Sequence, residues 1–196
     1  MHPVLLVHGI NDTGARFDKM RSVLQAHGLG PVHAMNTTPS DASITLEAMG
    51  EQVMDGIREL RESAETQKVD IVAFSMGALA ARYALYALDG QSSVRRLVSV
   101  SGPHHGTLTA YLSRNAGAEQ MRPGSRFLRD LDAGGGQCGD VEVFSFWSPL
   151  DLVVIPATSS VLEGAHNRAF GVAMHHHMPS DDRVIEAIVR ALTPAD

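Results

Sequence analysis

Short apolar runs of strand length alternate along this chain with segments whose apolar residues recur at helical spacing. Such an alternation predicts right-handed crossovers between parallel strands, with helices packed on both faces of one sheet. Strands are predicted at 4–7, 31–35, 69–74, 94–100, 141–147 and 169–172, and helices at 15–26, 44–60, 78–88 and 181–192. The expected fold class is therefore α/β, a three-layer α/β/α sandwich around a mostly parallel sheet.

One segment, 107–139, breaks the alternation with short helical patterns and a run of three glycines at 134–136. It is too long for a tight connection, so we expect it to cross the carboxyl edge of the strands as a cover or lid. The glycine run is too short to separate two domains, and a hydrophobic content of 44% is typical of one globular unit. Residues 1–196 are therefore expected to form a single domain.

The charge balance argues against nucleic acid as a partner, because 16 Lys and Arg stand against 22 Asp and Glu. No apolar run approaches the roughly 18 residues of a membrane span, so no span is expected. The start of the chain lacks the basic region and cleavage signal of an export leader. The single cysteine, Cys138, cannot form an internal disulfide. We expect a cytoplasmic protein, with a removed export signal as the alternative.

The junction between the third predicted strand and the third predicted helix carries a serine, Ser75, between small residues at Ala73 and Gly77. A serine at a sharp strand-to-helix turn projects its hydroxyl above the sheet edge, next to a helix amino terminus. This pattern is typical of a nucleophile elbow. The alternative is a serine that only caps the following helix.

A serine hydroxyl becomes a good nucleophile when a histidine removes its proton and a carboxylate orients that histidine. In a fold of this kind the acid and the histidine follow the serine along the chain, at the carboxyl ends of strands. Asp151 follows the strand predicted at 141–147, with a simple turn aspartate as the alternative. Any of His175, His176 and His177 could be the base. A metal site on the three histidines is the less favoured interpretation, because no supporting carboxylate or thiolate lies nearby in the sequence.

Acyl transfer at a serine also needs backbone donors for the oxyanion that develops on the substrate. Met76, directly after Ser75, can supply one N–H group, and Ile10, in the loop after the first strand, can supply the other. Three further histidines occur in loops at the same edge of the sheet, and we interpret all three as loop-packing residues. They are His8, His104 and His105.

Taken together, these motifs resemble those of the α/β-hydrolase fold, and among its members the small bacterial lipases and esterases. The resemblance rests on residues 7–10, 73–77 and 101–107, on Asp151 and on the terminal histidines, and so covers nearly the whole chain. It implies hydrolysis of carboxylic esters without a cofactor or metal, with a small ester or lipid as substrate. The implied nucleophile, acid and oxyanion donors are Ser75, Asp151, Ile10 and Met76, and the spacing to Met178 and Val184 favours His175 as the base.

The sequence departs from the pattern of these lipases at two elbow positions. Phe74 stands where they usually carry His, and Ala78 replaces a second Gly, which puts the shape of the acyl pocket in question. The segment 107–139 lies where larger lipases carry lid helices. Six of its apolar side chains either line an acyl-binding cleft or only cover the sheet edge: Leu108, Tyr111, Leu112, Met121, Phe127 and Leu128.

Four other functions fit the same sequence. The same catalytic residues could serve a thioesterase or an acyltransferase, in which only the substrate or the acceptor differs. The chain could instead be a non-catalytic binding module, because a fold does not determine a function. A metal-dependent hydrolase on the histidine run would lose its activity to a chelator.

Overall fold

Six parallel strands form one sheet in the order β2-β1-β3-β4-β5-β6. The computed structural model describes residues 2–133 and 140–193. The strands are β1 (Val4–Val7), β2 (Val32–Ala34), β3 (Val69–Phe74), β4 (Val94–Val100), β5 (Glu142–Trp147) and β6 (His166–Ala169). The fold is thus the expected α/β class with a parallel sheet, and β1 and β3 at its centre are fully buried.

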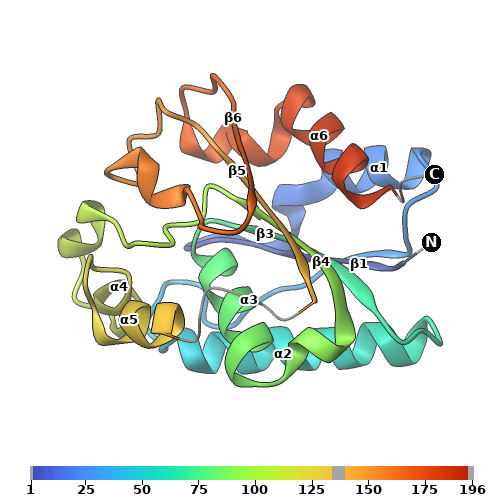
Figure 1. The fold of residues 1–196 in the computed structure, drawn as a ribbon, viewed down its shortest axis with the longest axis horizontal. Coiled ribbons are helices and arrows are strands. Elements are labelled where there is room, and N and C mark those ends of the chain that lie inside the picture. The colour runs from blue at the N-terminus through green and yellow to red at the C-terminus, as the bar shows by residue number, and fades with distance from the viewer. Residues whose placement is uncertain (1, 134–139, 194–196) are drawn as a thin grey trace.

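Helices cover both faces of the sheet, as Figure 1 shows. On one face α2 (Leu46–Ser63) and α3 (Met76–Ala87) bury a core that includes Leu5 and Ile71. On the other face α1 (Asp18–Ala26) and α6 (Asp182–Leu192) bury a second core. The two cores exist because successive side chains of a strand point to opposite faces of the sheet. The three-layer arrangement follows.

The register of the sheet brings the carboxyl ends of the strands to one edge. Val7 of β1 lies opposite Ala73 of β3, which lies opposite Ser99 of β4, which lies opposite Ser145 of β5. The loops that follow these four strands therefore leave the sheet side by side. All the candidate site residues lie in these loops, at the start of α3 or in the loop that precedes α6.

The segment after β4 contains a 3₁₀ helix at Leu108–Leu112 and two short α-helices, α4 (Ala116–Gln120) and α5 (Arg126–Ala133). These match the short helical pieces predicted there. The predicted glycine linker at 134–136 and Cys138 lie outside the described residues.

Several predicted boundaries differ from the observed ones by up to three residues. The helix predicted at 44–60 is Leu46–Ser63, the helix predicted at 78–88 is Met76–Ala87, and the strand predicted at 31–35 is Val32–Ala34. The last strand was predicted at 169–172 but occupies His166–Ala169, three residues earlier. Its four residues are exposed at the edge of the sheet, and the apolar residues that suggested a strand, Phe170 and Val172, pack beneath α6 after the strand has ended. The helix predicted at 15–26 begins with a 3₁₀ turn at Gly14–Phe17, and the α-helix starts at Asp18.

Among the described helices, none has both the length and the apolar character that crossing a membrane requires.

Candidate active site

Ser75 occupies a strained turn between the end of β3 and the start of α3. Its φ angle is +54° and its ψ angle is −125°, a conformation that costs free energy for any residue with a Cβ. The turn is held by a hydrogen bond from the Ser75 N–H to the carbonyl of Val100 and by one from the Ala78 N–H to the carbonyl of Ser75. The hydroxyl therefore points away from the helix and does not cap it, since Ser75 makes no side-chain cap hydrogen bond.

Close backbone packing explains why the residues near Ser75 must be small. A Cβ at Gly77 would collide with the carbonyl oxygen of His8 and would lie 2.9 Å from that of Val7. A Cβ at Gly9 would lie 3.0 Å from the Cβ of Ser75. The loop after β1 therefore rests directly on the elbow.

Ser75, His175 and Asp151 form a continuous hydrogen-bonded row, although the serine and the histidine are 100 positions apart in the sequence. His175 Nε2 lies 3.0 Å from Ser75 Oγ, and His175 Nδ1 lies 2.7 Å from Asp151 Oδ2. Because the carboxylate can only accept, the Nδ1–H donates to Asp151, and Nε2 is left to accept the Ser75 hydroxyl proton. All three side chains are buried.

Asp151 is anchored by its own loop. Its Oδ1 accepts hydrogen bonds from the N–H groups of Val153 and Val154, at 2.9 and 3.0 Å. Burial by itself would raise the pKa of Asp151, but the hydrogen bond and charge of His175 and the two backbone donors outweigh it and hold the pKa below its ordinary value. The carboxylate therefore stays ionised next to the imidazole.

The other two histidines of the run lie apart from Ser75. The side chains of His176 and His177 are exposed, and their rings contact each other with centroids 4.3 Å apart. Within 2–133 and 140–193, the His, Cys, Asp and Glu side chains form no group of three that could hold a metal ion. Of the three candidate bases, the structure brings His175 to the serine.

Phe74 packs against the imidazole of His175, with ring centroids 4.8 Å apart. The sequence comparison with lipases had pointed to this residue as a determinant of acyl-pocket shape. In the structure its ring contacts the imidazole of His175 and belongs to the apolar cluster on the α1 and α6 face of the sheet.

The loop that carries Ile10 is fixed by the buried imidazole of His8. His8 Nε2 accepts the Thr37 N–H at 3.0 Å, so its Nδ1 carries the proton and donates to the carbonyl of Gly9 at 2.8 Å. Within the described part of the chain, the N–H groups of Ile10 and Met76 make no hydrogen bond. Both donors are therefore free for a ligand, and His8 has the loop-packing role predicted for it.

Thr107 holds the loop that follows Asp151, a role that the sequence analysis did not identify. Its hydroxyl donates to the carbonyl of Val153 at 2.7 Å and accepts the N–H of Ile155 at 2.9 Å. The only signal for it was its place at the end of the 101–107 motif, which resembled the lipases as a whole.

His104 and His105 also have the predicted packing roles. His104 is fully buried and hydrogen-bonds Ser99 through Nε2 at 2.9 Å, and His105 Nε2 lies 3.0 Å from the carbonyl of Val161. Burial, the nearby charge of Arg82 and the neighbouring His105 together hold the pKa of His104 well below its ordinary value. His104 is therefore neutral near pH 7.

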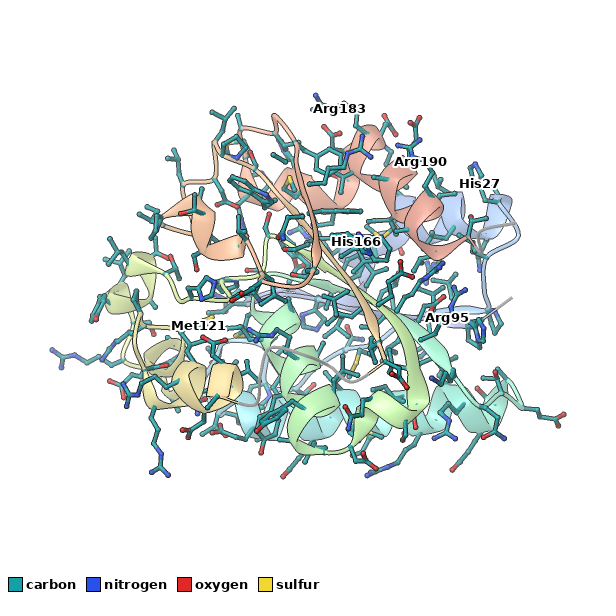
Figure 2. The ribbon with its side chains drawn as sticks, viewed as in Figure 1. His27, Arg95, Met121, His166, Arg183 and Arg190 are labelled. Atoms are coloured by element: carbon teal, nitrogen blue, oxygen red, sulfur yellow. The ribbon has the colours of Figure 1, made fainter. Side chains whose placement is uncertain are left out.

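The six apolar residues that the sequence placed over the cleft divide into two groups. Met121, Phe127 and Leu128 are buried in the core on the α2 and α3 side, so lining a cleft was the wrong alternative for them; Figure 2 labels Met121 among the short helices. Three others are exposed, namely Leu108, Tyr111 and Leu112. The Leu108 N–H donates to the carbonyl of Ile155 at 2.8 Å, so this exposed group lies beside the loop of Asp151.

More exposed apolar side chains flank Asp151 and His175 themselves. Leu150, Leu152 and Val153 surround Asp151 in the sequence, and Met174 precedes His175. Leu112 is 89% exposed and Leu152 is 75% exposed. We refer to these seven residues, Leu108, Tyr111, Leu112, Leu150, Leu152, Val153 and Met174, as the apolar rim.

Comparison with known proteins relates the sequence to one family. The family model described as palmitoyl protein thioesterase matches residues 3–131, more than half of the chain. A triacylglycerol lipase from Pseudomonas fragi is 33% identical over 113 residues, which cover 54% of this chain and 36% of the lipase. The match thus spans about a third of the length of that relative.

Solved structures show the same fold at low sequence identity. The mature form of the Bacillus licheniformis lipase BlEst2 superposes with a TM-score of 0.85 and 16% identity, covering 98% of this chain and 92% of the lipase. Lipase B from Aspergillus fumigatus gives a TM-score of 0.81 and 20% identity, covering all of this chain and 54% of the lipase. These proteins have the α/β-hydrolase fold described above.

Proposed function

This chain belongs to the palmitoyl protein thioesterase family, and from that premise we propose that it is a serine hydrolase of carboxylic esters that acts through an acyl-Ser75 intermediate. The row of hydrogen bonds from Ser75 through His175 to Asp151 is the observation that carries the proposal. Nucleophile, base and orienting acid lie within the reach that proton transfer requires.

In the first step His175 Nε2 accepts the Ser75 proton while Oγ attacks the acyl carbonyl carbon. The imidazolium that forms is stabilised by Asp151, which remains ionised. The resulting tetrahedral intermediate collapses when its bond to the leaving oxygen breaks, and His175 gives its proton to that oxygen. Water, which gives a proton to His175, then attacks the acyl-serine. The second tetrahedral intermediate collapses to release the carboxylic acid, and His175 returns the proton to Ser75 Oγ.

Ile10 and Met76 are proposed as the donors to the oxyanion. Their N–H groups are unpaired within the described residues, and the loop of Ile10 is held against the elbow by Gly9 and by the hydrogen bonds of His8. Donors that are already in place need no reorganisation as charge develops on the carbonyl oxygen.

The apolar rim supports the proposal that the protein recognises the acyl group of its substrate. Contiguous exposed apolar side chains on a soluble surface commonly mark a binding site. Those of the rim belong to the loops on either side of Asp151 and His175. We propose that the acyl chain of the substrate lies along them.

A thioester is the second candidate substrate, and the name of the matching family favours it. The same Ser75 attack would expel a thiolate in place of an alkoxide. Because a thiolate leaves without needing a proton, hydrolysis of a thioester depends less on proton donation by His175 in the collapse of the first intermediate.

The test is hydrolysis of p-nitrophenyl esters from acetate to decanoate, together with a decanoyl thioester, by the wild-type chain and by Ser75→Ala. We expect Ser75→Ala and His175→Ala to lose at least about 10³-fold in kcat. His176→Ala and His177→Ala are matched controls that replace exposed histidines of the same run, and they should retain activity. A chelator should change nothing.

Two other outcomes would redirect the proposal. A folded wild-type chain that hydrolyses no ester or thioester and is not labelled at Ser75 by a fluorophosphonate would be a binding module. Labelling of Ser75 without hydrolysis, followed by acyl transfer to an added alcohol or thiol, would identify an acyltransferase.

A further inference from the structure

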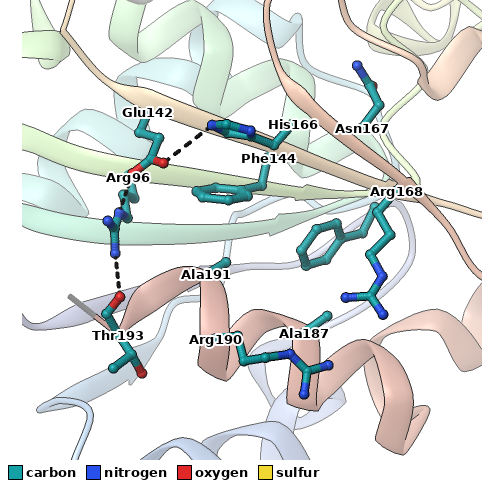
Figure 3. A pocket seen from close by; sticks show the side chains of 11 residues that line it. Arg96, Glu142, Phe144, His166, Asn167, Arg168, Ala187, Arg190, Ala191 and Thr193 are labelled. Atoms are coloured by element: carbon teal, nitrogen blue, oxygen red, sulfur yellow. Dashed lines mark hydrogen bonds and ion pairs between the residues drawn. The ribbon is translucent and has the colours of Figure 1, made fainter. Parts of the chain in front are cut away.

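A groove of about 770 Å³ lies on the flank of the molecule, away from Ser75, between α6 and the outer strands β5 and β6. Figure 3 shows it from close by, with side chains from both walls. None of Ser75, Asp151 and His175 lines it. Its volume is in the range of pockets that bind small molecules.

The groove exists because α6 presents small side chains to this part of the sheet. Ala187 and Ala191 form the helix wall, and they leave room in front of β5 and β6 that larger side chains would fill. The facing wall is aromatic. Phe144 stacks on the imidazole of His166, with centroids 4.8 Å apart and planes at 27°, and Phe146 lies edge-on to Phe144.

Three guanidinium groups surround this apolar wall, although the chain as a whole has a net charge of −6. Arg96 is already engaged, because its Nε lies 2.6 Å from Glu142 Oε2 and its Nη1 donates to the carbonyl of Thr193 at 2.9 Å. Glu142 also lies 3.3 Å from His166, so its carboxylate is shared within the groove.

The other two guanidinium groups have little counter-charge. Within the described residues Arg168 forms no ion pair and contacts the ring of Phe170, and Arg190 has only a long contact of 3.8 Å with Glu186. Figure 3 shows the two side chains extending toward one another from β6 and from α6. Among residues 2–133 and 140–193 no carboxylate pairs with Arg168, and guanidinium groups that converge from separate elements suit an anion that binds both.

We infer that this groove binds an amphiphilic carboxylate, whose apolar part lies on Phe144 and Phe146 and whose carboxylate lies between Arg168 and Arg190. The charge complementarity of the two arginines selects the anion, and the aromatic wall with its facing alanines selects a flat or extended apolar body. Fatty acids and aromatic acids share this chemistry. The inference does not depend on the proposed hydrolysis, because a free carboxylate is not a substrate of that reaction.

The experiment titrates decanoate, 2-naphthoate and the uncharged decan-1-ol into the wild-type chain by calorimetry, below the micelle concentration of each. We expect at least one carboxylate to bind at least tenfold more tightly than the alcohol. The better of the two acids distinguishes an aliphatic from an aromatic ligand.

Substitutions in the groove test whether the ligand binds there. Arg168→Gln and Arg190→Gln should each weaken binding of the carboxylate at least tenfold, and Ala191→Leu should weaken it by filling the groove. The matched control is Arg183→Gln, which replaces an arginine of the same helix that is held by Asp181 outside the groove; it should change binding less than twofold. Amide chemical shifts should move at Asn167 and Ala187.

The inference is overturned if neither acid binds at millimolar concentration. It is also overturned if binding persists unchanged in folded Arg168→Gln and Arg190→Gln chains, or if the amide shifts are confined to the loops around Ser75. That last pattern would place the carboxylate at the active site, and ester hydrolysis by the same samples would show independently whether the proposed function stands.

Discussion

The ring of Phe74 lies 4.8 Å from the imidazole of His175, centroid to centroid, and is tilted 35° from its plane. Phe74 is the last residue of β3 and immediately precedes Ser75. The residue before Ser75 therefore packs against the imidazole of His175, and the core around Phe74 limits the directions in which that imidazole can tilt.

Replacing Phe74 by Leu should lower kcat about three- to tenfold, because a misplaced base costs rate even when it is still present. Because Leu lacks three of the buried side-chain carbons of Phe, the free energy of unfolding should also fall, by about 1–3 kcal/mol. Phe170→Leu is the matched control, because Phe170 is buried in the same cluster without contact to His175. Equal losses of kcat in the two variants would contradict a positioning role for Phe74.

Replacing Asp151 by Asn should lower kcat about 10³- to 10⁴-fold, because the amide can present an N–H to His175 and favour the wrong tautomer. The fluorophosphonate labelling rate of Ser75 should fall in parallel. Asp181→Asn serves as the control, since Asp181 caps α6 and pairs with Arg183 away from Ser75, and Asn caps a helix equally well. Full activity of Asp151→Asn would remove Asp151 from the proposed mechanism.

His104 should make stability depend on pH. In the unfolded chain this histidine takes up a proton near pH 6.5, whereas in the folded chain its pKa is held well below that value by burial and by Arg82. The unfolded state then binds more protons than the folded state. The contribution of His104 to the free energy of unfolding is therefore largest above about pH 6.5 and is lost as the pH falls below that value. The expected contribution to the slope is at most about 1.4 kcal/mol per pH unit.

Urea unfolding between pH 7.5 and 5 measures this slope, which should be shallower in His104→Gln than in the wild type. His27→Gln is the control for replacing an exposed histidine. Parallel curves for wild type and His104→Gln would show that His104 carries no such linkage.

The apolar rim should determine the preference for acyl length. Leu112→Ser and Leu152→Ser should raise KM for the decanoyl ester about three- to tenfold, through loss of apolar contact, and leave KM for the acetate ester nearly unchanged. Because both side chains are exposed, stability should change by less than about 0.5 kcal/mol. Tyr86→Ser, an exposed apolar position on α3, is the control. An equal change of KM for esters of all acyl lengths would contradict the proposal that the apolar rim binds the acyl chain.

Most of the fold could be predicted from apolar periodicity, because buried strands such as Val69–Phe74 are continuously apolar apart from one residue, Asp70. The exception was β6, whose four exposed residues carry no apolar signal. An edge strand has one neighbour and little burial, so its sequence is set by solvent, while the apolar Phe170 and Val172 belong to the packing that follows it. Apolar patterns in a sequence indicate which residues are buried. Here the buried residues, Phe170 and Val172, are not the ones that pair with β5.

The grouping of Ser75, Asp151 and His175 could be predicted because chain order and strand ends restrict where such residues can lie. The contacts of Phe74 and Thr107 could not be predicted, because both depend on the direction of a side chain in three dimensions. The groove beside α6 was also hidden in the sequence. It arises where two alanines of a helix face two phenylalanines of a strand, and no linear motif records that.

The separation of 100 positions between Ser75 and His175 has a consequence for the order of events when the chain is made. A ribosome-bound chain that has completed β4 contains the elbow and the Val100 carbonyl that holds it, but neither Asp151 nor His175. On the proposed mechanism, its serine hydroxyl then has only ordinary reactivity. Hydrolytic competence would thus arrive late, with the loops that follow β5 and β6.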